Sequence, residues 1–422
     1  MPAIPHRPPG LDDVDPTPTA RAPLRGVRVV EFTHMVMGPM AGLVLADLGA
    51  EVLKIEPADG DRTRHLLGAG IGFFPLFNRN KASLGIDLKH PEGAAVARRL
   101  ALAADVVIEN FKPGALEKLG LGFEALAAEN PRLIYVSCKG FLPGPYEHRT
   151  ALDEVVQMMG GLAYMTGRPG DPLRAGSSVN DIMGGMWAAI GVLAALRERE
   201  ATGRGRLITS ALFENNIWLV AQHMLQAQIT ERVVDPMPNR ISPWAIYDVF
   251  TVADGEQIFL SAVSDAQWQT FCRAFGFEDL LDVPDYATNN DRVRARPVLI
   301  PLLRERLAQR SAAELAALCE AHGLPYAPIR APHELVDDPH LTATGGLVPM
   351  RLPDGAKAGQ TVKTALAPLT FDGERLPMRT DPPRLGEGAI DWLEAAGVDT
   401  VSLERLRSAG IITVAETSAH AA

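Results

Sequence analysis

The chain has 422 residues, a formal net charge of −10 and 47% hydrophobic residues. This length exceeds one ordinary core and favours two domains, and the acidic balance argues against a nucleic-acid partner, which needs clustered Lys and Arg. Three widely spaced cysteines, Cys138, Cys272 and Cys319, form neither a metal-ligand pattern nor a disulfide framework. We therefore expect no metal site and a reducing, cytoplasmic location.

The first part of the chain has the pattern of an α/β domain. Residues 1–23 are rich in proline and lack the apolar run of a signal peptide, so we expect a flexible leader. Apolar strands then alternate with helical patterns: the strands are GVRVVEFT, AEVLKIEP, DVVIENF and LIYVSCKG, and the helices between them are GPMAGLVLADLG, PEGAAVARRLALAA and FEALAAEN. Such alternation predicts a parallel sheet, here a Rossmann-like large domain over 24–230. The usual glycine-rich fingerprints for dinucleotides and triphosphates are absent.

A second, smaller domain is predicted over 231–330. Three prolines between 236 and 243 mark a linker, and AIYDVFTVADGEQIFLSAV then reads as two strands joined by an Asp-Gly turn. Helical patterns follow, which together indicate an α+β domain. A further Pro- and Gly-rich stretch predicts that 331–410 returns to the large domain, and 411–422 is expected to be a flexible tail.

The stretch SSVNDIMGGMWAAIGVLAALRERE at 177–200 combines a carboxylate with a long apolar helix. Its apolar run is shorter than the ~20 residues that a bilayer needs, so we interpret it as a buried core helix and expect no membrane partner. Asp181 lies near the start of the helix, and Gly184 and Gly185 follow it. Either Asp181 is an ordinary N-cap, or the glycines let a ligand approach a reactive carboxylate. The residues alone leave both interpretations open.

Seven separated stretches resemble, in order, the class III CoA-transferases, the family of formyl-CoA transferase, carnitine CoA-transferase and α-methylacyl-CoA racemase. They are GVRVVEFTHMVMGPMAG, LADLGAEVLKIEP, NRNKASLGIDLKHPEG, DVVIENFKPGALEKLG, NPRLIYVSCKG, RAGSSVNDIMGGM and GVLAALREREATGRG. With a weaker match in the second domain, the resemblance covers roughly residues 24–405. It implies an interlocked homodimer, two ring-like chains threaded through each other, and an acyl-CoA thioester as substrate with no permanently bound cofactor.

The resemblance assigns the family's catalytic nucleophile to Asp181. The implied reaction is covalent: the carboxylate attacks an acyl-CoA donor to give an acyl-aspartyl anhydride, and CoA thiolate then forms an aspartyl-CoA thioester. A carboxylic acid acceptor takes over the CoA through a second anhydride. The N-terminus of the helix is expected to keep Asp181 ionised, and its N–H groups to stabilise an oxyanion.

The same resemblance implies residues for CoA binding and for the substrate side. The CoA-binding residues are Met35, Val36, Lys89, Asn110, Phe111, Lys118 and Lys139, and the substrate-side residues are Asp153, Gly184 and Gly185. The lysines also have a purely structural interpretation, because a lone lysine on a loop is usually a solvated side chain. An acidic residue at the Asp153 position fits hydrogen-bond acceptance equally well.

Two departures from the family limit what the resemblance implies. The chain has PMPNRISPWAIY where formyl-CoA transferase carries a glycine-rich active-site loop. It also has Leu152 where the racemase has a histidine, and racemisation needs a base on each face of the α-carbon. His148 lies nearby as a substitute. We therefore predict a CoA-transferase acting on short-chain or dicarboxylic acids, with a racemase or epimerase and a non-catalytic acyl-CoA binding protein as the alternatives.

Overall fold

The computed structural model describes residues 22–240 and 242–415, and the chain divides into two compact units. Unit 1 combines Met1–Arg232 with Pro339–Ala422, and unit 2 is Val233–Asp338. Unit 2 therefore extends past the boundary predicted at 330. Most of the predicted leader, residues 1–21, lies outside the described residues.

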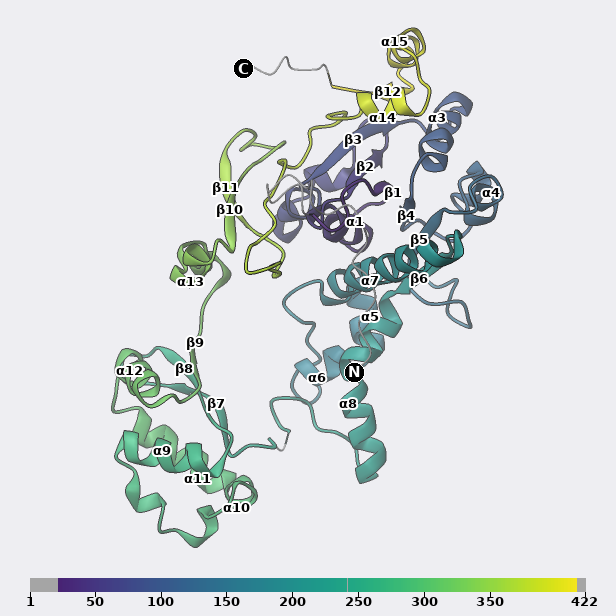
Figure 1. The fold of residues 1–422 in the computed structure, drawn as a ribbon. Coiled ribbons are helices and arrows are strands. Elements are labelled where there is room, and N and C mark those ends of the chain that lie inside the picture. Colours follow the sequence, from purple (N-terminus) through teal and green to yellow (C-terminus); the bar gives the residue numbers. More distant parts are fainter. Residues whose placement is uncertain (1–21, 241, 416–422) are drawn as a thin grey trace, which may run out of the picture. The chain divides into compact units, whose positions relative to one another are not determined.

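Unit 1 is built on a seven-stranded sheet with the order β12-β3-β2-β1-β4-β5-β6 (Figure 1). The six parallel strands are β1 (Arg28–Phe32), β2 (Glu51–Glu56), β3 (Lys81–Ile86), β4 (Val106–Glu109), β5 (Ile134–Lys139) and β6 (Leu207–Ala211). This is the strand order of a Rossmann sheet, in which the order reverses between β1 and β4. The predicted α/β, Rossmann-like architecture of the large domain is therefore confirmed.

The helices of unit 1 cover both faces of this sheet. They are α1 (Met37–Asp47), α2 (Phe73–Phe77), α3 (Pro91–Leu102), α4 (Phe123–Ala127), α5 (Asp153–Met159), α6 (Leu162–Thr166), α7 (Val179–Thr202) and α8 (Leu212–Thr230). Short 3₁₀ helices are η1 (Arg62–His65), η2 (Gly68–Gly72) and η3 (Glu117–Leu119). Neighbouring strand residues point to opposite faces, so Val30 joins one buried cluster with α3 while Val29 joins another with α1 and α7.

The segment after unit 2 adds further elements to unit 1. It contains α13 (Pro339–Ala343), the hairpin β10 (Leu347–Arg351) and β11 (Thr361–Ala365), α14 (Ile390–Ala395), α15 (Thr400–Ser408) and β12 (Ile412–Thr413). Strand β12 pairs antiparallel with β3, and Ile411, Ile412 and Val414 are buried in the core. The prediction of a flexible tail over 411–422 is therefore wrong for 411–415, because these apolar side chains complete the core.

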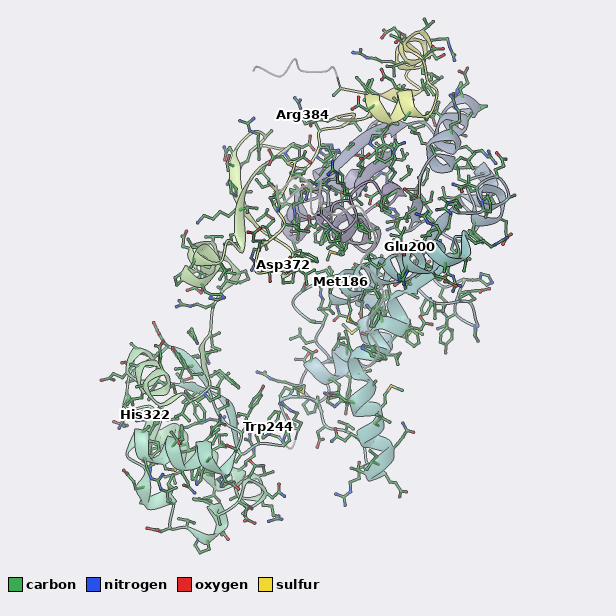
Figure 2. The ribbon with its side chains drawn as sticks, in the orientation of Figure 1. Met186, Glu200, Trp244, His322, Asp372 and Arg384 are labelled. Atoms are coloured by element: carbon green, nitrogen blue, oxygen red, sulfur yellow. The ribbon has the colours of Figure 1, made fainter. Side chains whose placement is uncertain are left out.

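Helix α7 is only partly a core helix. Buried residues such as Ala188 and Val192 face the sheet, whereas an apolar side that includes Met186, labelled in Figure 2, is exposed. By length and composition alone α7 is long and apolar enough to cross a membrane, and 39% of its most apolar stretch is buried. The prediction of a buried core helix is therefore wrong for the exposed side.

Unit 2 consists of a small antiparallel sheet and helices. The sheet contains β7 (Ile246–Thr251), β8 (Gln257–Ala262) and β9 (Tyr326–Pro328), and the helices are α9 (Asp265–Phe275), η4 (Glu278–Leu280), η5 (Pro284–Tyr286), α10 (Asn289–Arg294), α11 (Arg296–Leu307), α12 (Ala312–His322) and η6 (Pro332–Asp337). As predicted, β7 and β8 flank an Asp-Gly turn, in which Gly255 adopts a φ of 79°. A separate buried cluster, which includes Trp268 and Phe271, holds this α+β unit together.

Candidate active site

A cavity of about 580 Å³ lies in unit 1 at the carboxyl ends of β1, β4 and β5. In Rossmann sheets, ligands bind outside the carboxyl ends of the strands, where the strand order reverses. The lining residues include His34, Met35, Val36, Asn110, Lys139, Leu152, Asp153, Glu154, Arg174, Ser177, Ser178 and Asp181. The cavity thus brings the predicted nucleophile to the loops that were predicted to bind CoA.

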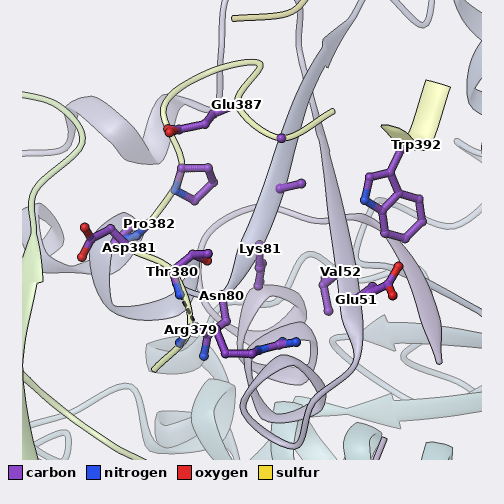
Figure 3. Close-up of a pocket in the computed structure, with 13 residues that line it drawn as sticks. Glu51, Val52, Asn80, Lys81, Arg379, Thr380, Asp381, Pro382, Glu387 and Trp392 are labelled. Atoms are coloured by element: carbon purple, nitrogen blue, oxygen red, sulfur yellow. Dashed lines mark hydrogen bonds between the residues drawn. The ribbon is translucent and has the colours of Figure 1, made fainter. Parts of the chain in front are cut away.

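A second cavity of about 640 Å³ lies at the opposite, amino ends of β2 and β3 (Figure 3). Its polar groups are largely used for structure. The Asn80 side-chain oxygen accepts the backbone N–H groups of Arg379 and Thr380, at 2.6 and 3.0 Å. The Arg379 guanidinium donates to the carbonyl oxygens of Ala46 and Ala50, both at 2.8 Å, beside the C-terminal end of α1. We therefore take the first cavity as the candidate active site.

The N-terminus of α7 is capped from another helix. Asp181 is the third residue of α7, and Ser178 at the N-cap position makes no side-chain capping bond. Instead Asp153, at the start of α5, accepts the N–H groups of Asn180 and Asp181 at 2.8 and 3.4 Å. The interpretation of Asp181 as an N-cap is therefore wrong, since Asp153 fills that role.

Capping by Asp153 also changes what the helix N-terminus can do. The N–H groups of Val179 and Ile182 donate to the carbonyl oxygens of Ser177 and Ser178, and those of residues 180 and 181 donate to Asp153. The first turn of α7 thus has its donors occupied. The expectation that these N–H groups stabilise an oxyanion is wrong for this arrangement.

The Asp181 side chain is half-buried and accepts no hydrogen bond from the described residues. Burial, together with the nearby Asp153 and Glu154 carboxylates, raises the pKa of Asp181 to about 7. The expectation that the helix N-terminus keeps Asp181 at a low pKa is therefore wrong, because burial and two like charges outweigh it. The result is a carboxylate that ionises near neutral pH and has no hydrogen bond among the described residues that would compete with a ligand.

Gly184 and Gly185 lie against α1 and not in the cavity. A Cβ atom on Gly185 would lie 2.6 Å from the carbonyl oxygen of Met37, and one on Gly184 would lie 2.7 Å from the end of the Met37 side chain. Glycine is needed here because two helices approach closely. The prediction of a substrate-side role for the pair is therefore wrong.

Asn110 joins the loops that follow β1 and β4. Its side-chain oxygen accepts the N–H of His34 at 3.0 Å, and its amide donates to the carbonyl oxygen of His34 at 2.7 Å. The adjacent Met35 has a left-handed φ of 63° and lines the cavity with Val36. Asn110 thus fixes the loop that presents Met35 and Val36.

The predicted CoA-binding lysines differ in their positions. Lys139 lines the cavity, but its ammonium group is held by the buried Glu109 at 2.7 Å and by the Phe111 carbonyl oxygen at 2.7 Å. Phe111 is outside the cavity lining, with its ring 5.5 Å from that of His34. Lys89 and Lys118 are exposed and do not line the cavity.

Neither position considered for the racemase base, Leu152 or His148, supplies a base in the cavity. Leu152 lines the cavity and is 58% exposed. The His148 side chain is 85% exposed, forms an ion pair with Glu147 and is absent from the cavity lining. Neither residue offers a second base beside Asp181.

Comparisons with known proteins identify the family of this chain. The sequence model of CoA-transferase family III matches residues 24–389. The chain belongs to CoA-transferase family III. A class III CoA-transferase is an enzyme, so the alternative of a non-catalytic binding protein is excluded. Its substrates are an acyl-CoA donor and a carboxylic acid acceptor.

Several relatives of this class III CoA-transferase carry named activities. A succinate–glutarate CoA-transferase of Agrobacterium fabrum is 34% identical over 383 residues, covering 88% of this chain and 94% of that protein. A succinyl-CoA:glutarate CoA-transferase of Mus musculus is 30% identical over 403 residues, covering 94% and 91%. The crystal structure of a CAIB/BAIF family protein from Brucella suis matches with a TM-score of 0.77 and 34% identity, covering 89% of this chain and 99% of that chain.

The cavity of the transferase also contains residues that the sequence analysis did not assign to a site. They include His34, Cys138, Arg174 and an apolar wall of Phe73, Leu76, Phe77 and Ile182. Burial lowers the pKa of His34 and raises that of Cys138, so both are neutral at neutral pH. Arg174 opens the stretch RAGSSVND that leads to Asp181, and this proximity was the one sequence signal for it.

Proposed function

We propose that this class III CoA-transferase uses Asp181 as a covalent nucleophile to move CoA from an acyl-CoA to a free carboxylic acid. The observation that carries the proposal is the Asp181 carboxylate itself, which lies in the cavity without a hydrogen-bond partner among the described residues. A structural carboxylate is normally paired when it is buried. One that is left unpaired beside a ligand cavity fits a group that forms a bond to substrate.

The reaction proceeds in two balanced halves. The ionised Asp181 attacks the thioester carbonyl, releases CoA thiolate and becomes an acyl-aspartyl anhydride. The thiolate then attacks the aspartyl carbonyl, which forms the aspartyl-CoA thioester and releases the donor acid with one oxygen from Asp181. The acceptor carboxylate attacks this thioester, which expels CoA thiolate again and gives a second anhydride. CoA thiolate finally attacks the acceptor carbonyl and regenerates the aspartate.

The loops at the carboxyl ends of β1 and β4 are proposed to bind the CoA portion. Met35 and Val36, which line the cavity, are proposed to contact the thioester arm, and Asn110 acts by holding their loop. Lys89 and Lys118, exposed outside the cavity lining, are proposed to contact the CoA phosphates, which extend beyond a buried thioester. Lys139 has its charge paired with Glu109, so its proposed role is to shape the loop.

Dicarboxylic acids are the proposed substrates. The support comes from relatives named for succinate, glutarate and D-citramalate, the last at 34% identity over 343 residues. The apolar wall around Ile182 and Phe77 suits the methylene chain of such an acid. A short, flexible dicarboxylate therefore fits both the wall and the reactive carboxylate.

A second copy of the chain is the proposed cover for the exposed apolar side of α7. This patch comprises Met186, Trp187, Ile190 and Leu193 on α7 and Trp218, Leu225 and Ile229 on α8. The rings of Trp187 and Trp218 lie 5.9 Å apart, so the two helices present one surface. Patches of this kind mark protein interfaces. The interlocked homodimer implied by the resemblance predicts that two tagged preparations do not exchange subunits within hours, whereas rapid exchange or a monomeric mass contradicts it.

The donor half-reaction tests the proposed nucleophile. The enzyme is incubated with succinyl-CoA without acceptor, digested and searched by mass spectrometry for a CoA thioester on the peptide that contains Asp181. We expect this adduct in the wild type and not in Asp181→Ala, which also loses CoA transfer by orders of magnitude. Asp171→Ala, which removes an exposed carboxylate outside the cavity, is the matched control. An Asp181→Ala variant that keeps a tenth of the wild-type rate, about 1.4 kcal/mol of barrier, contradicts the assignment.

A further inference from the structure

Arg174 lines the candidate active site and is paired with a carboxylate that a substrate can replace. Its Nη1 pairs with the Glu154 carboxylate, and its Nε donates to the Ala175 carbonyl oxygen at 3.1 Å. In the described part of the chain, Nη2 makes no hydrogen bond. The side chains of Arg174 and Glu154 are 38% and 48% exposed, so their ion pair is open to solvent and weak.

The other basic residues of the cavity are not available in this way. Lys139 is held by the buried Glu109 and by the carbonyl oxygen of Phe111. His34 is neutral, because burial lowers its pKa. Among the described cavity-lining residues, Arg174 is therefore the cation that can release its partner carboxylate, Glu154, and bind an anionic ligand in its place.

Arg174 also lies at the end of the cavity that contains Asp181. The Glu154 carboxylate is close enough to Asp181 to raise its pKa, and Arg174 is bonded directly to Glu154. Asp153, Glu154 and Asp181 give this cavity three carboxyl groups. A second carboxylate entering such a site needs a cation, and a guanidinium fork matches a carboxylate geometrically.

We propose that Arg174 binds the non-reacting carboxylate of a dicarboxylic substrate, which displaces Glu154. The inference rests on the proposed function, since the reacting carboxylate is the one exchanged at Asp181. Donor acyl group and acceptor acid occupy the same place relative to Asp181 in turn. One arginine therefore serves the free carboxylate of both, and it selects dicarboxylic over monocarboxylic acids.

Paired acceptors test the inference. Glutarate and valerate have the same carbon chain but differ by one carboxylate, and each is measured as acceptor with succinyl-CoA fixed and saturating. In Arg174→Gln we expect the KM for glutarate to rise about 10- to 100-fold, as expected for loss of a charged hydrogen-bond pair. The kcat/KM for valerate should stay within about twofold. The KM for glutarate in Arg174→Lys should lie between those of the wild type and Arg174→Gln, because lysine keeps the charge but cannot form two parallel hydrogen bonds to a carboxylate.

Two further variants sharpen the comparison. Arg168→Gln removes an exposed arginine outside the cavity lining and should leave both acceptors unchanged. Glu154→Gln removes the competing carboxylate, so it should lower the KM for glutarate. Equal losses with glutarate and valerate in Arg174→Gln, or no change with glutarate, overturn the inference.

The CoA adduct on Asp181 reports separately on the proposed function. If the enzyme forms the adduct but its KM for glutarate does not depend on Arg174, only the inference is overturned. A wild-type enzyme that prefers valerate to glutarate does the same. Failure to form the adduct overturns the proposed nucleophile and the inference with it.

Discussion

Replacing Asp181 by Asn should stabilise the protein at neutral and alkaline pH. The carboxylate has its pKa raised from 3.8 to about 7 by burial and by two neighbouring acids. A raised pKa of an acid means that the folded state disfavours the charge, so the penalty is absent below pH 3.8, grows up to pH 7 and is then constant. The full displacement corresponds to about 4 kcal/mol. Because the side chain keeps some contact with solvent, we expect roughly 2–4 kcal/mol.

Thermal unfolding across pH measures this effect. For the roughly 300 residues of unit 1, 2–4 kcal/mol corresponds to an increase of about 3–6 °C in the unfolding midpoint of Asp181→Asn above pH 7. The difference should shrink toward zero as pH falls to about 4. Asp171→Asn, at an exposed carboxylate, should show no such trend. Parallel pH curves for the wild type and Asp181→Asn would refute the claim that Asp181 is buried at a cost to stability.

Three more predictions concern the rate and the packing. The donor half-reaction should rise about tenfold per pH unit below pH 7 and level off above it, with the midpoint moved to lower pH in Glu154→Gln; a rate that falls through this range contradicts an ionised nucleophile. Gly185→Ala should cost about 1–3 kcal/mol in denaturant unfolding because its Cβ meets the Met37 backbone, whereas Gly184→Ala meets only a side-chain end and should cost less; the reverse order argues against close packing. Glu109→Gln should destabilise the protein by about 2–4 kcal/mol and raise the KM for CoA substrates, because Lys139 loses its counter-charge, while Glu117→Gln at an exposed site should have neither effect.

The sheet could be predicted wherever a strand contains adjacent large apolar residues. β1, β2, β4 and β5 each contain at least two such neighbours, and the sequence identified each of these strands. β3 was missed because Lys81 and Ser83 interrupt its apolar pattern. In the fold both are buried, with the Lys81 ammonium 2.8 Å from Glu31 and the Ser83 hydroxyl 2.6 Å from Glu56. Local patterning cannot reveal partners supplied by distant strands.

The sequence singled out residues that meet in the cavity, but not the interactions around them. Asp181, the proposed nucleophile, and the loops after β1 and β4 line the same cavity. The capping role of Asp153 joins residues that are 27 and 28 positions apart, so no local spacing shows it. Likewise, the pair Gly184 and Gly185 signals a close approach, but the sequence does not tell whether a ligand or a helix approaches.

Transfer of a heavy-oxygen label tests the central claim most directly. The acceptor is glutarate with heavy oxygen in both carboxylates, and it is turned over with unlabelled succinyl-CoA. The mass of the peptide that contains Asp181 is then measured by mass spectrometry. Because the acceptor carboxylate attacks the aspartyl thioester and leaves its bridging oxygen behind, the account predicts heavy oxygen in the Asp181 carboxylate, and in succinate released during later turnovers. CoA transfer with no label in Asp181 would contradict the account, since CoA would then pass between the acids without a bond to this residue.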